Sequence, residues 1–264
     1  MSNAAARRES SQDSAALSNR ILANQMFGSA DLSHWLIEQL ALRRDDTLLD
    51  VGCGTAVHLR AFARAIGRPG ACTGVDVSAS SLDIARGSEA DSHLSLRLQA
   101  LEMEHLDRLL PAHRFSLITA VYSLYYSRDT WDTLDQMRAL LPEDGSGRIA
   151  IMGPYGNNNA EWFRFIGQFM SLPDRVREST TTFMFDPVLR FATTHFGTIV
   201  CRRFVNRICI PSKSELERYW RSNVYYKEEY DAAFDACATR HFEENSDFTY
   251  SKVGQLVVME APIR

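Results

Sequence analysis

The chain has 264 residues, of which 45% are hydrophobic and 23% charged, a composition typical of a soluble globular protein with a core of ordinary size. Its 29 Lys and Arg residues face 33 Asp and Glu residues, and the resulting net charge of −4 argues against a general polyanion binder. No run approaches the roughly 18 apolar residues of a membrane span, and no signal-peptide core opens the chain, so the predicted location is cytoplasmic.

Cysteine usage agrees with that location. The sequence holds 5 cysteines, with no C-x-x-C pair and no zinc-type spacing to histidine. An odd number argues against a complete disulfide framework of a secreted protein. We expect reduced, partly buried thiols and no metal.

The N-terminal part is predicted to be a polar tail followed by helices. Residues 1–13 are small, polar and charged, which favours disorder. Helical periodicity begins near Ser14, and a second helix follows Asp31, a favourable N-cap residue. These helices occupy residues 14–44.

From Asp45 onward, short apolar runs alternate with helical segments. The predicted strands are residues 47–52, 71–77, 95–101, 115–121 and 148–153. One helix is predicted to follow the first strand and end at Ile66, a second to begin at Ser78, and a third to span about 130–141. This alternation predicts an α/β fold with a parallel sheet and right-handed crossovers.

After Gly153 the alternation is less regular. Turn residues fill 153–159, and the predicted elements that follow are a helix over 160–170, strands over 198–210 and 254–261, and helices over 214–222 and about 228–244. No repeat or flexible linker divides the chain. We therefore predict one domain over residues 14–264, with residues 45–153 as its cofactor-binding half and residues 154–264 as its substrate-side half.

The most informative segment is Asp50-Val51-Gly52-Cys53-Gly54, at the end of the first predicted strand. Its glycines let the backbone approach a ligand and turn sharply into a helix. Asp76 ends the second predicted strand, 22 residues after Gly54, a spacing that suits a carboxylate binding two ribose hydroxyls.

Two kinds of nucleotide ligand fit such a loop. A dinucleotide fold places a third glycine where Val57 stands, and Asp50 would repel a pyrophosphate. The same acid suits a cationic amino group. The loop therefore favours a nucleoside without phosphates, such as S-adenosylmethionine, over a dinucleotide.

These residues resemble the class I S-adenosylmethionine-dependent methyltransferases of the small-molecule type. The matching segments, in order, are residues 48–56, 74–78, 101–106 and 115–126. The resemblance implies a Rossmann-like seven-stranded, mostly parallel sheet with helices on both faces and an antiparallel last strand. It also implies a lid made by the helices of residues 14–44 and by an insertion after the fifth strand.

The resemblance also implies roles for individual residues. Asp50, Gly52, Cys53 and Gly54 would line the methionine and ribose portions of the cofactor. Further cofactor contacts would come from Asp76 to the ribose, Val77, Glu102 and Met103 to the adenine, and the Val121 carbonyl to the methionine amine. The family carries an Asp after its third strand that this chain lacks, so Glu102 is the candidate substitute.

Catalytic and acceptor residues are predicted from their position after strands. Tyr122 and Tyr125 follow the fourth strand, where tyrosines can flank a sulfonium or bind an acceptor, and His34 is the candidate base. Tyr155, Asn157 and Trp162 are the candidate acceptor contacts. Alternatively these aromatic residues pack the core, the Asn cluster is a solvated turn, and the helix of Trp162 forms a homodimer surface.

The resulting functional hypothesis is methyl transfer to an O, N or C nucleophile of a small metabolite or biosynthetic intermediate, with S-adenosylhomocysteine as product. Neither nucleic acid nor membrane is an expected partner. Two alternatives keep the cofactor, namely an enzyme of other chemistry and a catalytically inactive subunit. A dinucleotide oxidoreductase is the third.

Overall fold

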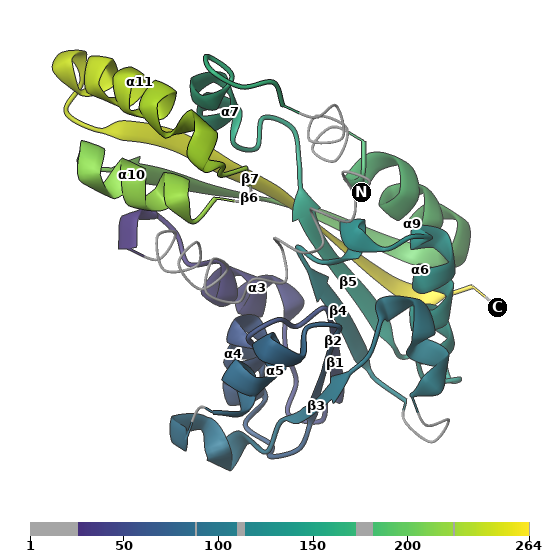
Figure 1. Cartoon of the computed structure of the whole chain (residues 1–264). Coiled ribbons are helices and arrows are strands. Elements are labelled where there is room, and N and C mark those ends of the chain that lie inside the picture. Colours follow the sequence, from purple (N-terminus) through teal and green to yellow (C-terminus); the bar gives the residue numbers. More distant parts are fainter. Residues whose placement is uncertain (1–25, 88, 110–113, 173–181, 224, 264) are drawn as a thin grey trace. The chain divides into compact units, whose positions relative to one another are not determined.

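The computed structural model describes residues 26–87, 89–109, 114–172, 182–223 and 225–263 (Figure 1). The predicted tail over 1–13 and most of the first predicted helix lie outside these ranges. Among the helices within them, none is long and apolar enough to cross a membrane.

The strands form one 7-stranded sheet in the order β3-β2-β1-β4-β5-β7-β6. Their bounds are β1 Leu48–Val51, β2 Cys72–Asp76, β3 Arg97–Ala100, β4 Leu117–Val121, β5 Arg148–Pro154, β6 Phe196–Ile210 and β7 Phe248–Pro262. The pairings among β1 to β5 are parallel, and β7 runs antiparallel to β5. The predicted Rossmann-like sheet with an antiparallel last strand is confirmed.

Helices connect the strands much as the sequence predicts. The α-helices are α3 Leu32–Leu40, α4 Val57–Ile66, α5 Ala79–Arg86, α6 Thr130–Ala139, α7 Ala160–Ile166, α9 Arg190–His195, α10 Lys213–Arg221 and α11 Asp231–Glu244. Shorter helical turns are η1 Glu89–Leu94, η2 Met103–Arg108, η3 Leu124–Tyr126, η4 Met184–Leu189 and η5 Glu228–Tyr230. The sequence did not predict η1, η2, η3, η4, α9 or the first residues of β7.

The predicted single domain contains two compact units. Within the described residues, the sheet unit comprises 32–155, 182–204 and 254–263, and the hairpin unit comprises 26–31, 156–172 and 205–253. The chain passes between them after Tyr155, near the predicted division at 153/154, and again within β6 and β7.

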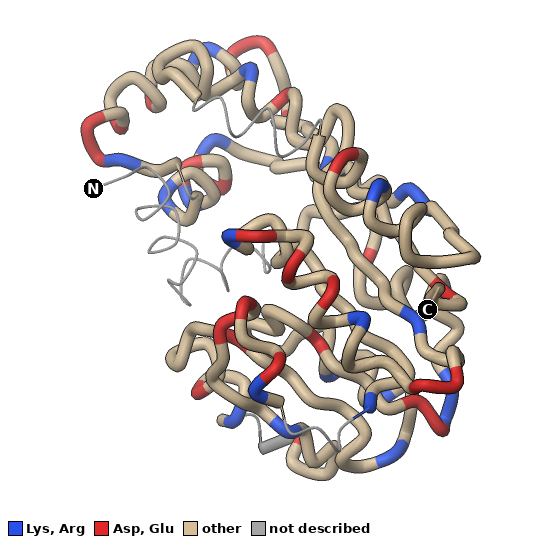
Figure 2. The backbone as a smooth tube through the Cα atoms, turned by 90° about the vertical axis from the view of Figure 1, so that its right-hand side faces the viewer, with Lys and Arg blue, Asp and Glu red and all other residues tan. Residues whose placement is uncertain are grey.

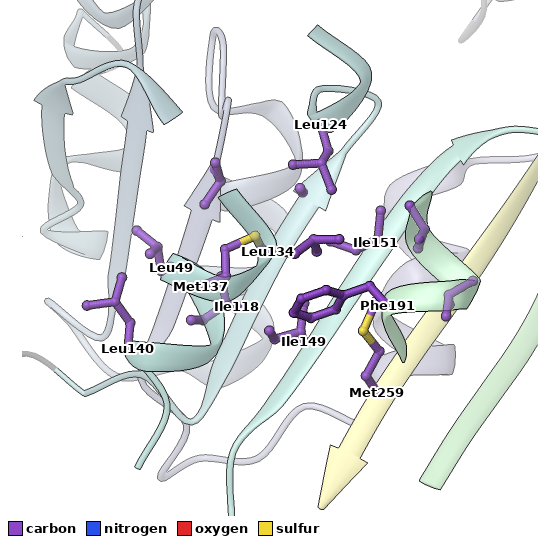
Figure 3. Close-up of a cluster of buried hydrophobic side chains, with 14 of the residues drawn as sticks. Leu49, Ile118, Leu124, Leu134, Met137, Leu140, Ile149, Ile151, Phe191 and Met259 are labelled. Atoms are coloured by element: carbon purple, nitrogen blue, oxygen red, sulfur yellow. The ribbon is translucent and has the colours of Figure 1, made fainter. Parts of the chain in front are cut away.

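The sheet unit has a mainly aliphatic core. Figure 1 shows α4 and α5 on one side of its parallel strands and α6 on the other. Strands covered on both faces read as continuous apolar runs, and every residue of β5 is buried. The side chains labelled in Figure 3 that pack between strands and helices are Leu49, Ile118, Leu124, Leu134, Met137, Leu140, Ile149, Ile151, Phe191 and Met259.

A buried ion pair joins the amino ends of β1 and β5, which lie on either side of β4 in this unit. Arg148, the first residue of β5, donates to Asp46 at 2.8 Å, and the Ser116 hydroxyl donates to the same carboxylate at 2.7 Å. Burial raises the pKa of Asp46, but the hydrogen bonds from the Arg43 amide, Ser116 and Arg148 outweigh it, so the pKa lies below its ordinary value. The pair is therefore ionised and satisfied at neutral pH.

The hairpin unit has an aromatic core. Trp162 lies edge-on to Tyr219 with ring centroids 5.0 Å apart, and Trp220 stacks on Phe234 at 5.3 Å. Such spacings are favourable for aromatic pairs. The cluster draws its buried members from α7, α10, α11 and the parts of β6 and β7 in this unit: Trp162, Phe165, Ile166, Ile208, Ile210, Leu216, Tyr219, Trp220, Phe234, Ala238, Phe248 and Tyr250.

Candidate functional site

The glycine loop after β1 turns tightly against the end of β4. Gly52 has φ 74° and Gly54 has φ 54°, a left-handed conformation that favours glycine. A Cβ added to Gly52 would overlap the Ser123 Cβ. Both conformation and close approach therefore require glycine at position 52.

Asp76 reaches across to this loop from the end of β2. The Gly54 amide donates to its Oδ2 at 2.7 Å, and the Ser78 amide donates to its Oδ1 at 2.8 Å. An ionised carboxylate has about four acceptor positions, so each oxygen keeps capacity for a ligand hydroxyl. The structure thus brings together the loop and the acid that the sequence spacing paired.

Asp50 is a buried carboxyl group beneath the same loop, with 2% of its surface exposed. Burial raises the pKa of Asp50 to about 7, and the negative charge of Asp76 raises it as well. The Thr119 hydroxyl, which donates to Oδ1 at 2.7 Å, has the opposite effect, which is smaller than that of burial. A cation placed nearby would favour the ionised form. Asp50 can therefore respond to a bound ammonium group.

Cys53 and Val77 differ in their exposure to solvent. The Cys53 side chain is buried, and a Cβ added to Gly74 would lie 2.7 Å from its Sγ, so this thiol packs against β2. Burial raises the pKa of Cys53. Val77 is 52% exposed and follows Asp76 directly, which offers an apolar surface beside the acid.

The segment after β3 lies beside β2. The Leu101 amide donates to the Asp76 carbonyl at 3.0 Å. Glu102 accepts from the Arg128 guanidinium at 3.3 Å, whereas the Met103 side chain packs against the core of the sheet unit. Arg128 was not predicted, because a partner 26 residues away on a loop leaves no local pattern.

The end of β4 is a strained turn. Tyr122 follows Val121 with φ 53°, a conformation that is costly for a bulky side chain. The Tyr122 amide donates to the Met152 carbonyl at 2.8 Å, and the Ser123 hydroxyl donates to the Val51 carbonyl at 2.5 Å. Ser123 thus ties this turn to β1, a role that the sequence did not predict.

The candidate catalytic residues occupy different surroundings. Burial of the Tyr122 hydroxyl raises its pKa, and Tyr125 packs edge-on against Phe183 with centroids 5.7 Å apart. His34 lies on α3 with its side chain 76% exposed, 3.3 Å from the Glu38 carboxylate. None of these observations tests a catalytic role.

The candidate acceptor residues divide between the units. Tyr155 is in the sheet unit and packs against its core, whereas Asn157 and Trp162 belong to the hairpin unit. Asn157 is exposed, and Trp162 is 1% exposed among the aromatic rings. The neighbouring Asn158 is structural, since its Oδ1 accepts from the Val253 amide at 3.0 Å.

The chemistry of the site is that of glycines, acids and apolar side chains at the carboxyl ends of β1, β2 and β4. Within the described ranges, no group of three or more His, Cys, Asp and Glu side chains could hold a metal ion. Lys and Arg are interspersed with Asp and Glu along the tube in Figure 2. The site is therefore suited to a small organic ligand with hydroxyl and amino groups.

Known proteins match part of the chain. Residues 48–145 match the family model of a methyltransferase domain. A ubiquinone biosynthesis O-methyltransferase from Coxiella burnetii is 31% identical over 110 residues, which are 41% of this chain and 44% of that protein. The aklanonic acid methyltransferase DauC from Streptomyces is 28% identical over 109 residues, 41% of this chain and 48% of DauC.

The match to these two relatives is partial, whereas the fold match is broad. The chain spans less than half the length of either relative. The solved structure of the YcgJ protein from Bacillus subtilis superposes with a TM-score of 0.57 over 88% of this chain and 98% of YcgJ, at 14% identity. Most of the chain thus shares a known fold, and the residues that match the family model include the glycine loop and the strands beside it.

Proposed function

We propose that this protein is a class I S-adenosylmethionine-dependent methyltransferase that transfers a methyl group to an O, N or C nucleophile of a small metabolite or biosynthetic intermediate. The match of residues 48–145 to the family model of a methyltransferase domain supports this proposal. The observation that carries the proposal is the geometry of Asp76, whose two oxygens are oriented by the Gly54 and Ser78 amides at the glycine loop. That arrangement suits a ribose diol.

The residues present fit S-adenosylmethionine chemically. Asp76 would accept from the ribose hydroxyls, exposed Val77 would pack on the adenine, and Glu102 would accept from the adenine amine. Asp50 and the Val121 carbonyl would face the methionine amine. The loop residues 52–56 include no Lys or Arg, in keeping with a ligand that lacks phosphates.

Catalysis then depends on position more than on proton transfer. The bound cofactor supplies a methyl group activated by its sulfonium. The protein has to align the acceptor with that methyl group and exclude water. Burial raises the pKa of the Tyr122 hydroxyl, so we propose that this residue contributes as a hydrogen-bonding group and not as a base.

The acceptor itself is proposed by class. The two relatives are named for ubiquinone biosynthesis and for aklanonic acid, both small molecules. The catalytic residues Tyr122, Tyr125 and His34 stay predictions, as do the acceptor contacts Tyr155, Asn157 and Trp162. So do the homodimer and the cytoplasmic location, which the 5 free cysteines support.

Calorimetric titration tests the cofactor assignment. We expect S-adenosylmethionine and S-adenosylhomocysteine to bind with micromolar affinity and NADH not to bind. Asp76→Ala should weaken the binding of both sulfur nucleosides by about 1–3 kcal/mol, the scale of hydrogen bonds to a charged group. The matched control is Asp83→Ala, which removes an exposed acid of α5 that pairs with Arg86. Equal affinity of the wild type and the Asp76 variant would remove Asp76 from the site.

Product analysis separates methyl transfer from the alternatives. Incubation with S-adenosylmethionine and a mixture of small acceptors should accumulate S-adenosylhomocysteine. Cofactor binding without this product, across hydroxyl, amine and carbon acceptors, would favour the inactive subunit or another chemistry on the same cofactor.

A further inference from the structure

The Tyr122 side chain packs against Gly254, a glycine distant in sequence. A Cβ added to Gly254, in β7, would overlap both the Tyr122 hydroxyl oxygen and the Met152 Cε. Gly254 opposes Pro154 of β5 in the antiparallel pairing. The tyrosine side chain therefore extends from the end of β4 to β7, and only a residue without a side chain leaves room for its hydroxyl.

The same tyrosine lies between two contacts of the candidate cofactor site. Its backbone is left-handed, and its amide is held by the Met152 carbonyl. On its N-terminal side is the Val121 carbonyl, and on its C-terminal side Ser123 packs on Gly52 and donates to the Val51 carbonyl. A displacement of the tyrosine ring would be transmitted to both neighbours, because the strained backbone has few other allowed conformations.

We propose that Gly254 is a positioning residue for the cofactor site: by seating the Tyr122 ring, it holds the Val121 carbonyl and Ser123 in place against the glycine loop. The inference rests on the proposed function, since it assigns the Val121 carbonyl to the amino group of the cofactor. Gly254 itself would touch neither cofactor nor acceptor.

Gly254→Ala directly tests whether the packing of Tyr122 against Gly254 positions the cofactor site. Its methyl group would overlap the Met152 Cε, the mobile end of a flexible side chain, and the Tyr122 oxygen, the end of a rigid ring. It would also lie 3.1 Å from the Gly153 carbonyl oxygen, a tight contact but not an overlap. Because Met152 can adjust and Tyr122 cannot without moving its backbone, the turn at Val121 should shift.

The measurement compares two ligands that differ at the amino acid end. S-adenosylhomocysteine carries the amino group, and methylthioadenosine lacks it. In Gly254→Ala, the affinity for S-adenosylhomocysteine should fall about 10-fold, the scale of one weakened charge-assisted hydrogen bond, and that for methylthioadenosine less than about 2-fold. A purely structural role would weaken both ligands alike.

A double-mutant cycle with Tyr122→Phe attributes the effect to the hydroxyl. Tyr122→Phe removes the oxygen that the added methyl group meets, so Gly254→Ala should weaken S-adenosylhomocysteine much less in the Tyr122→Phe background than in the wild type. The matched control is Gly197→Ala in β6, where an added Cβ makes ordinary contacts of 3.5 Å or longer. This control should bind both ligands as the wild type does.

Three outcomes would overturn the inference: unchanged affinities in Gly254→Ala, equal losses for both ligands, or no relief in the Tyr122→Phe background. If Gly254→Ala does not fold, Tyr122→Asn replaces it, because Asn tolerates the left-handed backbone but is too short to reach β7. This variant should also lose affinity for S-adenosylhomocysteine and keep its affinity for methylthioadenosine. Equal losses for the two ligands would contradict the positioning role of Gly254. If the wild type itself fails to bind S-adenosylhomocysteine, the proposed function fails first.

Discussion

The two units of this chain reach burial by different means. In the sheet unit, aliphatic side chains of paired strands and α6 form the core, and polar groups cluster at the carboxyl ends of the strands. In the hairpin unit, rings of Trp, Tyr and Phe pack on one another, with centroids as close as 5.0 Å. The family match of residues 48–145 falls entirely within the sheet unit.

The features that this chain shares with the family model lie in the sheet unit, and its aromatic core lies in the hairpin unit. The sheet unit carries the glycine loop and both acids that we assign to the proposed cofactor, and it contains the residues that match the family model. The hairpin unit carries a buried indole nitrogen, Trp162 Nε1, for which the described part of the chain offers no hydrogen-bond partner. The aromatic core of the hairpin unit lies outside the residues that match the family model. Substitutions in this core should therefore change the stability of the protein with little change in its affinity for the cofactor.

The largest expected effect is that of Trp162→Ala. Removing a buried ring leaves a cavity and should cost the hairpin unit about 3–5 kcal/mol of unfolding free energy. Affinity for S-adenosylhomocysteine should change by less than about 3-fold, because its proposed contacts all belong to the sheet unit. Denaturant unfolding followed by hydrogen exchange of each unit, with calorimetric titration alongside, measures both quantities.

Trp162→Phe is the matched control for this substitution. It keeps an aromatic ring and removes the unpartnered N–H group, so it should cost clearly less than Trp162→Ala. Loss of cofactor affinity in proportion to the loss of stability would contradict the division of roles between the two units.

The next largest expected effect is the contribution of Asp50 to the pH dependence of stability. Its pKa in the folded protein, about 7, lies above the ordinary value of 3.8, so the folded state binds the proton more tightly than the unfolded state. Stability should therefore fall as the pH rises from about 4 to 7, by up to about 1.4 kcal/mol per pH unit, and level off above 7. Asp50→Asn should lack this component of the pH dependence.

Cofactor affinity should change in the opposite direction over the same range. A bound ammonium group favours the ionised carboxylate, so affinity for S-adenosylhomocysteine should rise toward pH 7 and then level off. Methylthioadenosine, without the amine, should show a flatter profile. If the wild type and the Asp50→Asn variant give the same pH profile for both ligands, Asp50 does not meet the amine.

The same contrast explains how much the sequence could predict. The strands and glycine loop of the sheet unit were predictable because apolar runs, Gly52, Gly54 and Asp76 form local patterns with a known physical purpose. The start of β7 was missed, because residues 248–253 include polar side chains and are buried partly by aromatic residues distant in sequence. The helical stretch over 184–195 was missed too, and Pro187 inside it argues against a helix.

Individual site residues divide in the same way. Asp76 and Val77 could be proposed from the sequence because their role follows from the strand end that they occupy. Ser123, Gly254 and Arg128 could not, since each acts through a partner brought near only by the folded sheet. No spacing rule links Tyr122 to a glycine 132 positions later.

The smallest expected effect is at the exposed edge of the sheet unit. The Arg128–Glu102 pair spans 3.3 Å with side chains 62% and 41% exposed, so water and salt screen it. Arg128→Ala should change the unfolding free energy by less than about 1 kcal/mol and lower S-adenosylhomocysteine affinity by less than about 3-fold at low salt, with no difference at high salt. Glu102→Ala should weaken binding more and at every salt concentration, because it removes the proposed acceptor of the adenine amine and not only its partner. If the two variants behave alike, Glu102 serves the ion pair alone, and the adenine must be recognised by the backbone after β3.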